Sequence, residues 1–204
     1  MGDENSKTYN RNEKIINEEN KSERLEKDID KMWFDPCFSF EECVHANIAK
    51  DIMDDKIKSL KRLNEKENNF TKNIDLNKYR NDDGTFTIYK TSRPLNSSNG
   101  EQLYEMSKKL HHEGMAIGNG KNFIYSDYGV NENNSSVRFW DSKENKENWA
   151  DTEIVGKTNA SDNEVKEIFF GEKSEKWENP KDYNFIFHNC QDYAEEKIND
   201  FKGK

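Results

Sequence analysis

One cysteine of this sequence stands where the backbone can make it reactive. Cys190 follows a short apolar run at 185–187 and precedes a segment, 191–201, whose apolar residues recur with helical spacing. A thiol at the start of a helix meets the positive end of the helix dipole and unpaired backbone N–H groups, and both favour its thiolate form. The same N–H groups can stabilise an oxyanion when the thiolate attacks a carbonyl. The alternative is a structural cysteine, which is the commoner role of a single cysteine.

A nucleophilic cysteine needs a base, and the chain offers four histidines: His45, His111, His112 and His188. His188 is close to Cys190 in sequence, but we expect a strand-to-helix turn to direct it elsewhere, so we interpret it as a packing residue or as a wall of the site. His45 lies near Cys37 and Cys43 in a predicted helical region. Because that trio lacks the paired ligand spacing of zinc sites, we predict no metal there.

His112 lies at the start of a predicted β-hairpin, "HEGMAIGNGKNFIYSDYG" at 112–129. Asn119-Gly120 is a dipeptide favoured by two-residue type I′ turns, in which both residues have positive φ. Such a turn places Gly118 opposite Lys121 and His112 opposite Asp127. Directly opposed residues have Cβ atoms about 4.5–5.5 Å apart, so the Asp127 carboxylate could orient the His112 imidazole. Cys–His–Asp is a thiol-hydrolase arrangement. A bulge would shift this pairing, and an exposed histidine beside a solvated aspartate is the alternative.

Two glycines share the strand face of His112. Gly114, which this register places opposite Tyr125, and Gly118 leave room for a substrate or a helix. They could equally relieve crowding within the hairpin.

Helices are predicted to precede the sheet. Residues 1–30 are highly charged and indicate a solvent-laced helix or a disordered extension. Ser39 and Glu42 have the spacing of a capping box and begin the helix with the clearest pattern. Its apolar stripe comprises Phe40, Val44, Ile48, Ile52, Ile57 and Leu60.

Short strands and three further helices complete the prediction. Strands are expected at 86–93, ended by Pro94, and at 136–142, 152–156 and 183–187, in addition to the hairpin. Helices are expected at 99–111, at 161–170 with Ser161 and Glu164 as a capping box, and at 191–201. The inward residues of the last helix are Tyr193, Ala194, Ile198 and Phe201. This order is an α+β pattern, and we divide the chain into an extension at 1–35, a helical segment at 36–84 and a catalytic domain at 85–204.

Composition narrows the classes of function. The 204 residues include 36% charged residues and a formal net charge of −9, which argues against non-specific nucleic-acid binding. The apolar runs are too short for a transmembrane helix, and the N-terminus lacks a signal-peptide core. We therefore expect a cytoplasmic protein, or one exported by a non-Sec secretion system. A myristoylation pattern at Gly2 is interpreted as chance. Three cysteines do not form a disulfide framework and indicate synthesis in a reducing compartment.

Two segments together resemble the circularly permuted papain-like thiol hydrolases, which include permuted NlpC-type peptidases, the lecithin retinol acyltransferase family and PPPDE deubiquitinase-like peptidases. They are "HEGMAIGNGKNFIYSDYG" (112–129) and "YNFIFHNCQDYAEEKI" (183–198), with histidine before cysteine, as in the permuted order. The resemblance covers roughly 85–204 and implies an antiparallel sheet packed against a Cys-bearing C-terminal helix. It implies Cys190 as the nucleophile, His112 as the base and Asn189 in the nucleophile turn.

The acyltransferase branch usually has a histidine as its third polar residue, on the strand after the glycine turn. This chain has no histidine on that strand. Asp127 or Tyr125 must then be the third polar residue, or the enzyme works with a Cys190–His112 dyad alone. The expected substrate and oxyanion environment comprises Asn189, Gln191, Tyr125, Gly114 and His188.

The resulting hypothesis is a cysteine hydrolase, a peptidase or amidase that cleaves a peptide or isopeptide amide bond without a metal or organic cofactor. Peptidoglycan peptides are the first expected substrate, as for an effector or toxin with an inhibitory (immunity) partner. The alternatives are a deubiquitinase- or deSUMOylase-like isopeptidase, a lipid acyltransferase or phospholipase, and a non-enzymatic interaction module with a structural cysteine.

Overall fold

The computed structural model describes residues 10–35, 37–94, 111–131, 134–141, 151–178 and 189–204. They form two compact units, 1–69 and 70–204, here called the helical unit and the sheet unit. The division falls within a helix, ahead of residue 85, where the sequence analysis places the start of the catalytic domain. The α+β class is confirmed, because helices precede an antiparallel sheet and a helix ends the chain.

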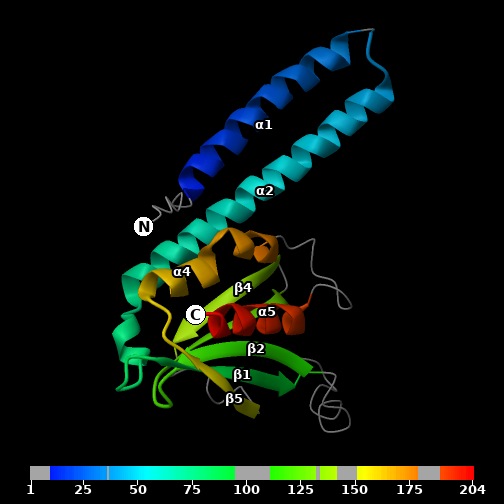
Figure 1. Cartoon of the computed structure of the whole chain (residues 1–204). Coiled ribbons are helices and arrows are strands. Elements are labelled where there is room, and N and C mark those ends of the chain that lie inside the picture. Colours follow the sequence, from blue (N-terminus) through cyan, green and yellow to red (C-terminus); the bar gives the residue numbers. More distant parts are fainter. Residues whose placement is uncertain (1–9, 36, 95–110, 132–133, 142–150, 179–188) are drawn as a thin grey trace. The chain divides into compact units, whose positions relative to one another are not determined.

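The helical unit is an antiparallel hairpin of α1 (Arg11–Phe34) and α2 (Phe40–Asn73), whose last residues enter the sheet unit (Figure 1). Asn10 caps α1, since its side chain accepts from the Glu13 N–H at 3.2 Å. The capping box of α2 is confirmed: Glu42 N–H donates to Ser39 Oγ at 3.2 Å, and Ser39 N–H donates to Glu42 Oε2 at 2.7 Å. The charged N-terminal segment is therefore helical from residue 11.

Polar residues occupy much of the seam between α1 and α2. The buried residues of α1 recur at spacings of three, four and seven, as in a coiled coil, and are Arg11, Ile15, Glu18, Ser22 and Ile29. Their partners on α2 are largely charged. Ser22 Oγ donates to Asp54 Oδ1 at 2.6 Å, Arg11 pairs with Glu67, and Lys56 pairs with Glu18 at 3.2 Å. The hairpin is thus held by ion pairs and hydrogen bonds as well as by apolar contacts.

The sheet unit contains one five-stranded antiparallel sheet in the order β4-β3-β2-β1-β5. A short 3-10 helix, η1 (Leu76–Tyr79), leads into β1 (Phe86–Pro94). The other strands are β2 (His111–Gly118), β3 (Phe123–Asn131), β4 (Asn134–Asp141) and β5 (Asp151–Thr158). Five of the six predicted strands are therefore present. The predicted strand at 183–187 and the predicted helix over 99–110 lie outside the described residues, and His111 belongs to a strand.

The β2–β3 hairpin corrects the predicted register. Gly114, not His112, is opposite Asp127, because the loop contains four residues, 119–122, rather than two. Asn119 does not have positive φ, so the turn is not type I′; its side chain instead accepts from the N–H groups of Lys121 and Asn122 at 3.1 and 2.9 Å. Asn119 also donates to the carbonyls of Lys78 and Arg80, which fixes the loop to the segment before β1.

Gly118 serves this turn. A Cβ at Gly118 would lie 2.1 Å from the Asn122 carbonyl oxygen, so the close approach of the two strands requires glycine. Of the two roles considered for Gly118, the geometry supports relief of crowding in the hairpin rather than space for a substrate.

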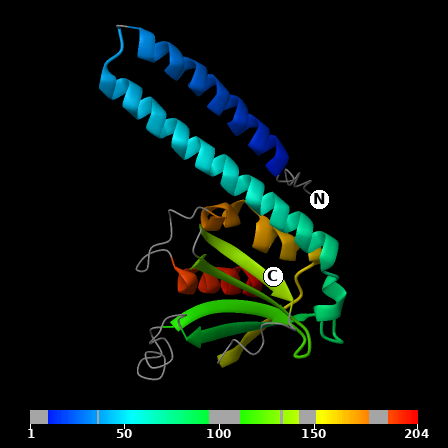
Figure 2. The ribbon, with the colours of Figure 1, turned by 180° about the vertical axis from the view of Figure 1, so that it is seen from behind.

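Three helical segments pack with the sheet (Figures 1 and 2). The C-terminal helix α5 (Cys190–Lys202) contacts β1, β2, β3 and β5, and α4 (Asp162–Phe170) packs against α5 and the 3-10 helix η3 (Glu172–Glu178). The Ser161–Glu164 capping box is present at α4. The predicted inward residues of α5 are all buried: Tyr193, Ala194, Ile198 and Phe201.

Aromatic side chains fill the core of the sheet unit. Tyr128, Trp177 and Tyr193 form one cluster, in which the Trp177 and Tyr193 rings meet edge to face at 5.3 Å. Phe169 packs against Phe201 at 5.2 Å between ring centroids. Among the helices that the structure describes, none has the length and apolar character needed to cross a membrane.

Candidate active site

Cys190 is the first residue of α5, and Asn189 caps the helix. The Asn189 side chain accepts from the N–H groups of Gln191 and Asp192 at 2.8 and 3.3 Å, and Asp192 accepts from the Asn189 N–H at 3.1 Å. This reciprocal capping box begins the helix at the cysteine. The spacing Asn189-x-x-Asp192 is the sequence signal for this cap, which the sequence analysis did not use. Cys190 itself is buried, with 5% of its surface exposed.

A buried hydrogen bond anchors α5 one turn after the cysteine. Tyr193 and Ser126 of β3 join their hydroxyl groups at 2.5 Å. Burial raises the pKa of Tyr193 well above its usual value, so the phenol stays protonated in this bond. Because Ser126 is adjacent to Asp127 in β3, the anchor fixes the start of α5 relative to the strand that carries the carboxylate.

His112 and Asp127 are in contact although the predicted register was wrong. His112 Nε2 lies 2.5 Å from Asp127 Oδ2, and both residues are buried. Asp127 is opposite Gly114, so His112 is its diagonal neighbour on the same face of the sheet. The contact survives because the register differs by two residues, and only an odd shift would reverse the face. Gly114 contributes no side chain between the imidazole and the carboxylate.

Cys190 is the second partner of His112. The imidazole forms a side-chain hydrogen bond with Cys190 as well as with Asp127. Since Asp127 engages Nε2, the other ring nitrogen, Nδ1, is the one available to the sulfur. Burial by itself lowers the pKa of His112, but the two hydrogen bonds and the negative charges of Asp127 and Cys190 outweigh it, and the pKa is raised above 6.5. The site therefore favours a protonated imidazole beside the sulfur.

Arg93 is a third polar neighbour that the sequence analysis missed. It is paired with His112 across β1 and β2, and its Nη2 lies 3.9 Å from Asp127 Oδ2. The fully buried Asp127 carboxylate thus faces a histidine and an arginine, which compensates the cost of burying its charge. The β1–β2 register decides this contact. It could not be derived from sequence, because the long connection over residues 95–110 does not fix how the two strands pair.

The structure describes two of the remaining predicted site residues, Tyr125 and Gln191. Tyr125 is opposite Ala116 and belongs to an apolar cluster with Tyr89 and Phe123. Burial, and secondarily Tyr89, raises the pKa of Tyr125, so its described surroundings are those of a core residue. Gln191 contributes its N–H to the Asn189 cap. His188 lies outside the described residues.

The other cysteines are free thiols. Cys37 is exposed and Cys43 is buried. Within the described ranges, no group of three or more His, Cys, Asp or Glu side chains is arranged to hold a metal ion.

No protein-family model, curated protein or solved structure matches this chain.

Proposed function

We propose that the sheet unit is a cysteine hydrolase that cleaves an amide bond. Cys190 is the nucleophile, His112 the base and Asp127 the carboxylate that orients the base. One observation carries this proposal: a buried imidazole, whose pKa is raised, is hydrogen-bonded both to a cysteine at a helix start and to a fully buried carboxylate. A structural cysteine requires neither partner.

The chemistry follows from the two bonds of the imidazole. His112 takes the thiol proton of Cys190, and the sulfur attacks the amide carbonyl carbon. The imidazolium, held by Asp127, then donates that proton to the departing amine as the carbon–nitrogen bond breaks. Water, deprotonated by His112, hydrolyses the thioester and releases the acid and the free thiol. The Asp127 charge stabilises the imidazolium at both stages.

The cap of α5 determines which backbone donor serves the oxyanion. Asn189 takes up the N–H groups of Gln191 and Asp192, so we assign the oxyanion contact to the N–H of Cys190, the first of the helix. This modifies the expectation that Gln191 contributes to the oxyanion environment.

We further propose that the sheet unit has a circularly permuted papain-like arrangement. The histidine strand precedes the cysteine helix in the chain, and that helix packs on an antiparallel sheet. The third polar group is a carboxylate rather than a second histidine, which favours an amide substrate over the lipid substrates of the acyltransferase branch. Peptidoglycan peptides are the first substrate to test, with ubiquitin-like isopeptides as the alternative; effector delivery and an inhibitory partner remain predictions.

Two measurements test the proposal. Mass spectrometry of peptidoglycan peptides, and of ubiquitin-like conjugates, after incubation should reveal new amide cleavage with the wild-type chain and none with Cys190→Ala. Site-resolved iodoacetamide labelling near pH 7 then reports on the thiol itself. The chain supplies its own standards, an exposed cysteine at 37 and a buried one at 43.

An activated Cys190 should be alkylated faster than Cys37 despite its burial, whereas an inert buried thiol would react as slowly as Cys43. Slow labelling of Cys190, together with cleavage that persists in Cys190→Ala, would overturn the proposal.

A further inference from the structure

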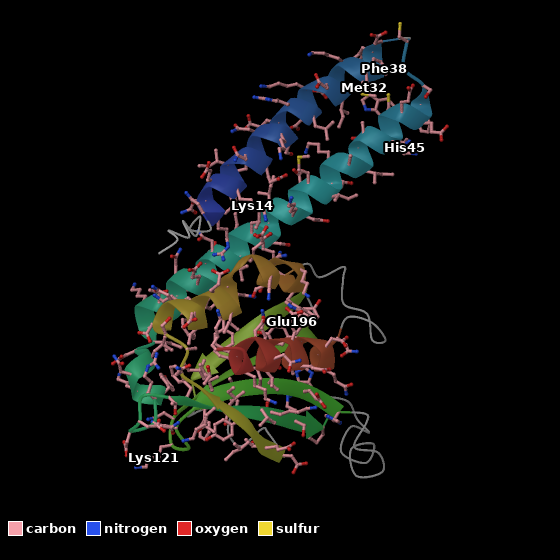
Figure 3. The ribbon with its side chains drawn as sticks, viewed as in Figure 1. Lys14, Met32, Phe38, His45, Lys121 and Glu196 are labelled. Atoms are coloured by element: carbon pink, nitrogen blue, oxygen red, sulfur yellow. The ribbon has the colours of Figure 1, made fainter. Side chains whose placement is uncertain are left out.

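The bend of the helical hairpin exposes a concentration of large apolar side chains. Six of them, here called the tip surface, have 43–90% of their area exposed: Trp33, Phe34, Phe38, Phe40, Ile48 and Ile52. Figure 3 labels Phe38 at the bend, with Met32 beside it at the end of α1. At the same level of the hairpin, Ile29 and Cys43 are already buried, so the interior of the bend does not require the exposed residues. Large exposed apolar side chains gathered in this way are typical of an interaction surface.

The bend is ordered by its own hydrogen bonds. Asp35 N–H donates to the Met32 carbonyl at 3.3 Å, and Phe38 N–H donates to the Asp35 carbonyl at 3.1 Å. The Asp35 carboxylate accepts from the Cys37 N–H at 2.9 Å, and the Ser39–Glu42 box closes the turn. The rings of Trp33 and Phe40 meet edge to face at 5.9 Å. The aromatic side chains are therefore presented in a fixed arrangement, which reduces the entropy cost of binding.

The apolar stripe of α2 divides into two halves. Ile57 and Leu60 are buried, whereas Phe40, Ile48 and Ile52 are 74%, 51% and 64% exposed. The exposed half recurs every fourth residue, with the half-buried Val44 between Phe40 and Ile48. Residues at this spacing form the ridge that fits a groove of a neighbouring helix. The exposed half of the stripe is thus suited to packing against a helix.

The charge around the tip surface specifies the partner further. Residues 28–55 include eight acidic residues and only two lysines. Both lysines are already paired, Lys31 with Asp28 at 3.4 Å and Lys50 with Asp54 at 2.8 Å. A partner that covers this surface must bring positive charge to its rim.

We propose that the tip surface is a docking site for an amphipathic helix of another protein, with an apolar face flanked by lysine or arginine. A second copy of this chain is disfavoured, because two tip surfaces would bring like charges together. The proposal is independent of the proposed catalysis and concerns residues of the helical unit only.

Fluorescence anisotropy with synthetic peptides tests both features of the partner. Two 18-residue dye-labelled amphipathic peptides share one leucine face, and their flanks carry either lysine or glutamate. The full-length chain should bind the lysine peptide saturably, and the glutamate peptide at least tenfold more weakly. The double variant Ile48→Ser/Ile52→Ser should weaken binding of the lysine peptide at least tenfold. Ile16→Ser, at an α1 isoleucine that is 56% exposed outside the tip surface, should change it less than twofold.

Four results would overturn the proposal. Equal binding of the two peptides would indicate general apolar adhesion, and equal losses in the double variant and Ile16→Ser would place the contact elsewhere. Sedimentation that shows a dimer of the wild-type chain, converted to a monomer by Ile48→Ser/Ile52→Ser, would make a second copy the occupant. Binding to phosphatidylcholine vesicles without binding to either peptide would indicate that the tip surface binds a lipid surface rather than a helix. Circular dichroism of each variant verifies that its helix content is unchanged.

Discussion

The two units bury their charged groups in different ways. In the helical unit, charged residues occupy seam positions and pair at its edges, as Glu18 does with the half-exposed Lys56. In the sheet unit, the charged groups Asp127 and Lys197 are fully buried, and each is satisfied by its own set of neighbouring polar groups. Asp127 faces His112 and Arg93, and Lys197 donates to the Ile168 carbonyl and to Ser174 Oγ, both at 2.7 Å.

This difference indicates which unit can support chemistry. Water screens the edge pairs of the helical unit, so each contributes about 0–1 kcal/mol to stability. Buried groups of the sheet unit interact at lower effective dielectric, where a neighbour can change a proton affinity substantially. The raised pKa of His112 and the lowered pKa of Lys197 both occur in the sheet unit.

The largest expected effect concerns the carboxylates of the two units. Asp127→Asn should lower amide hydrolysis by a hundredfold or more, of the order of 10²–10⁴, because a neutral amide cannot stabilise the imidazolium. It should also move the alkaline limb of the pH profile to lower pH, since the carboxylate that raises the pKa of His112 is lost. Asp54→Asn, at a seam acid that accepts a hydrogen bond from the Ser22 hydroxyl, should leave both unchanged. Equal effects of the two variants would remove the distinction between the units.

Core packing gives the next largest effect. Phe169 is fully buried and contacts Phe70, Phe170 and Phe201 edge to face. Phe169→Ala should lower the free energy of unfolding of the sheet unit by about 3–5 kcal/mol. Phe34→Ala, at a ring that is 90% exposed in the helical unit, should change stability by less than about 0.5 kcal/mol. Urea unfolding followed by circular dichroism and fluorescence compares the two variants. A similar loss in both would contradict the assignment of the aromatic core.

A buried lysine should give the sheet unit a distinctive dependence on pH. Burial lowers the pKa of Lys197 from 10.5 to about 8, despite the nearby acids Glu196 and Asp200. Stability from this group is fully present above pH 10.5 and is lost as the pH falls through 8. The free energy of unfolding of the wild type, relative to Lys197→Met, should therefore rise between pH 8 and 10.5, by at most about 3 kcal/mol.

Lys157→Met, at a side chain that is 59% exposed and is not among the neighbours that set the pKa of Lys197, is the control for that series. Its difference from the wild type should be the same at every pH. If Lys197→Met also gives a pH-independent difference, Lys197 does not titrate in this range.

Salt should give the smallest effect and should act on the helical unit. Raising NaCl from 0.1 to 1 M shortens the screening length from about 10 to 3 Å and weakens edge ion pairs. Amide hydrogen exchange in α1 should then accelerate by a few fold, whereas exchange in β1, β2 and β3 should not change. Glu19→Gln, which removes the pair with Lys61 at 2.6 Å, should reduce the salt response of α1. Salt-dependent exchange in the strands but not in α1 would contradict the assignment of the screened ion pairs to the helical unit.

Local signals explain what the sequence predicted well. The Ser39–Glu42 and Ser161–Glu164 boxes each mark a helix start, and both were found where the spacing placed them. The apolar period of residues 191–201 predicted the buried face of α5. These features depend on neighbours within a few residues, so the sequence contains most of their determinants.

The site depended on interactions that local patterns do not encode. The Asn119-Gly120 dipeptide predicted a two-residue turn, but contacts with Lys78 and Arg80 and the side-chain hydrogen bonds of Asn119 favour a four-residue loop. The register differs from the prediction by two residues, so His112 and Asp127 still lie on the same face of the sheet and are in contact. Arg93 was missed because it meets His112 only through the pairing of β1 with β2, which residues distant in the sequence determine.

The even register difference in the β2–β3 hairpin has a consequence for how this chain can vary. Insertion or deletion of two residues at 119–122 keeps the imidazole strand and the carboxylate strand in phase, at the cost of sliding one past the other. A one-residue change that slips the register by one residue puts them out of phase and turns the carboxylate away from the imidazole. The parity of a register shift, rather than its size alone, therefore decides whether the two side chains stay on one face of the sheet.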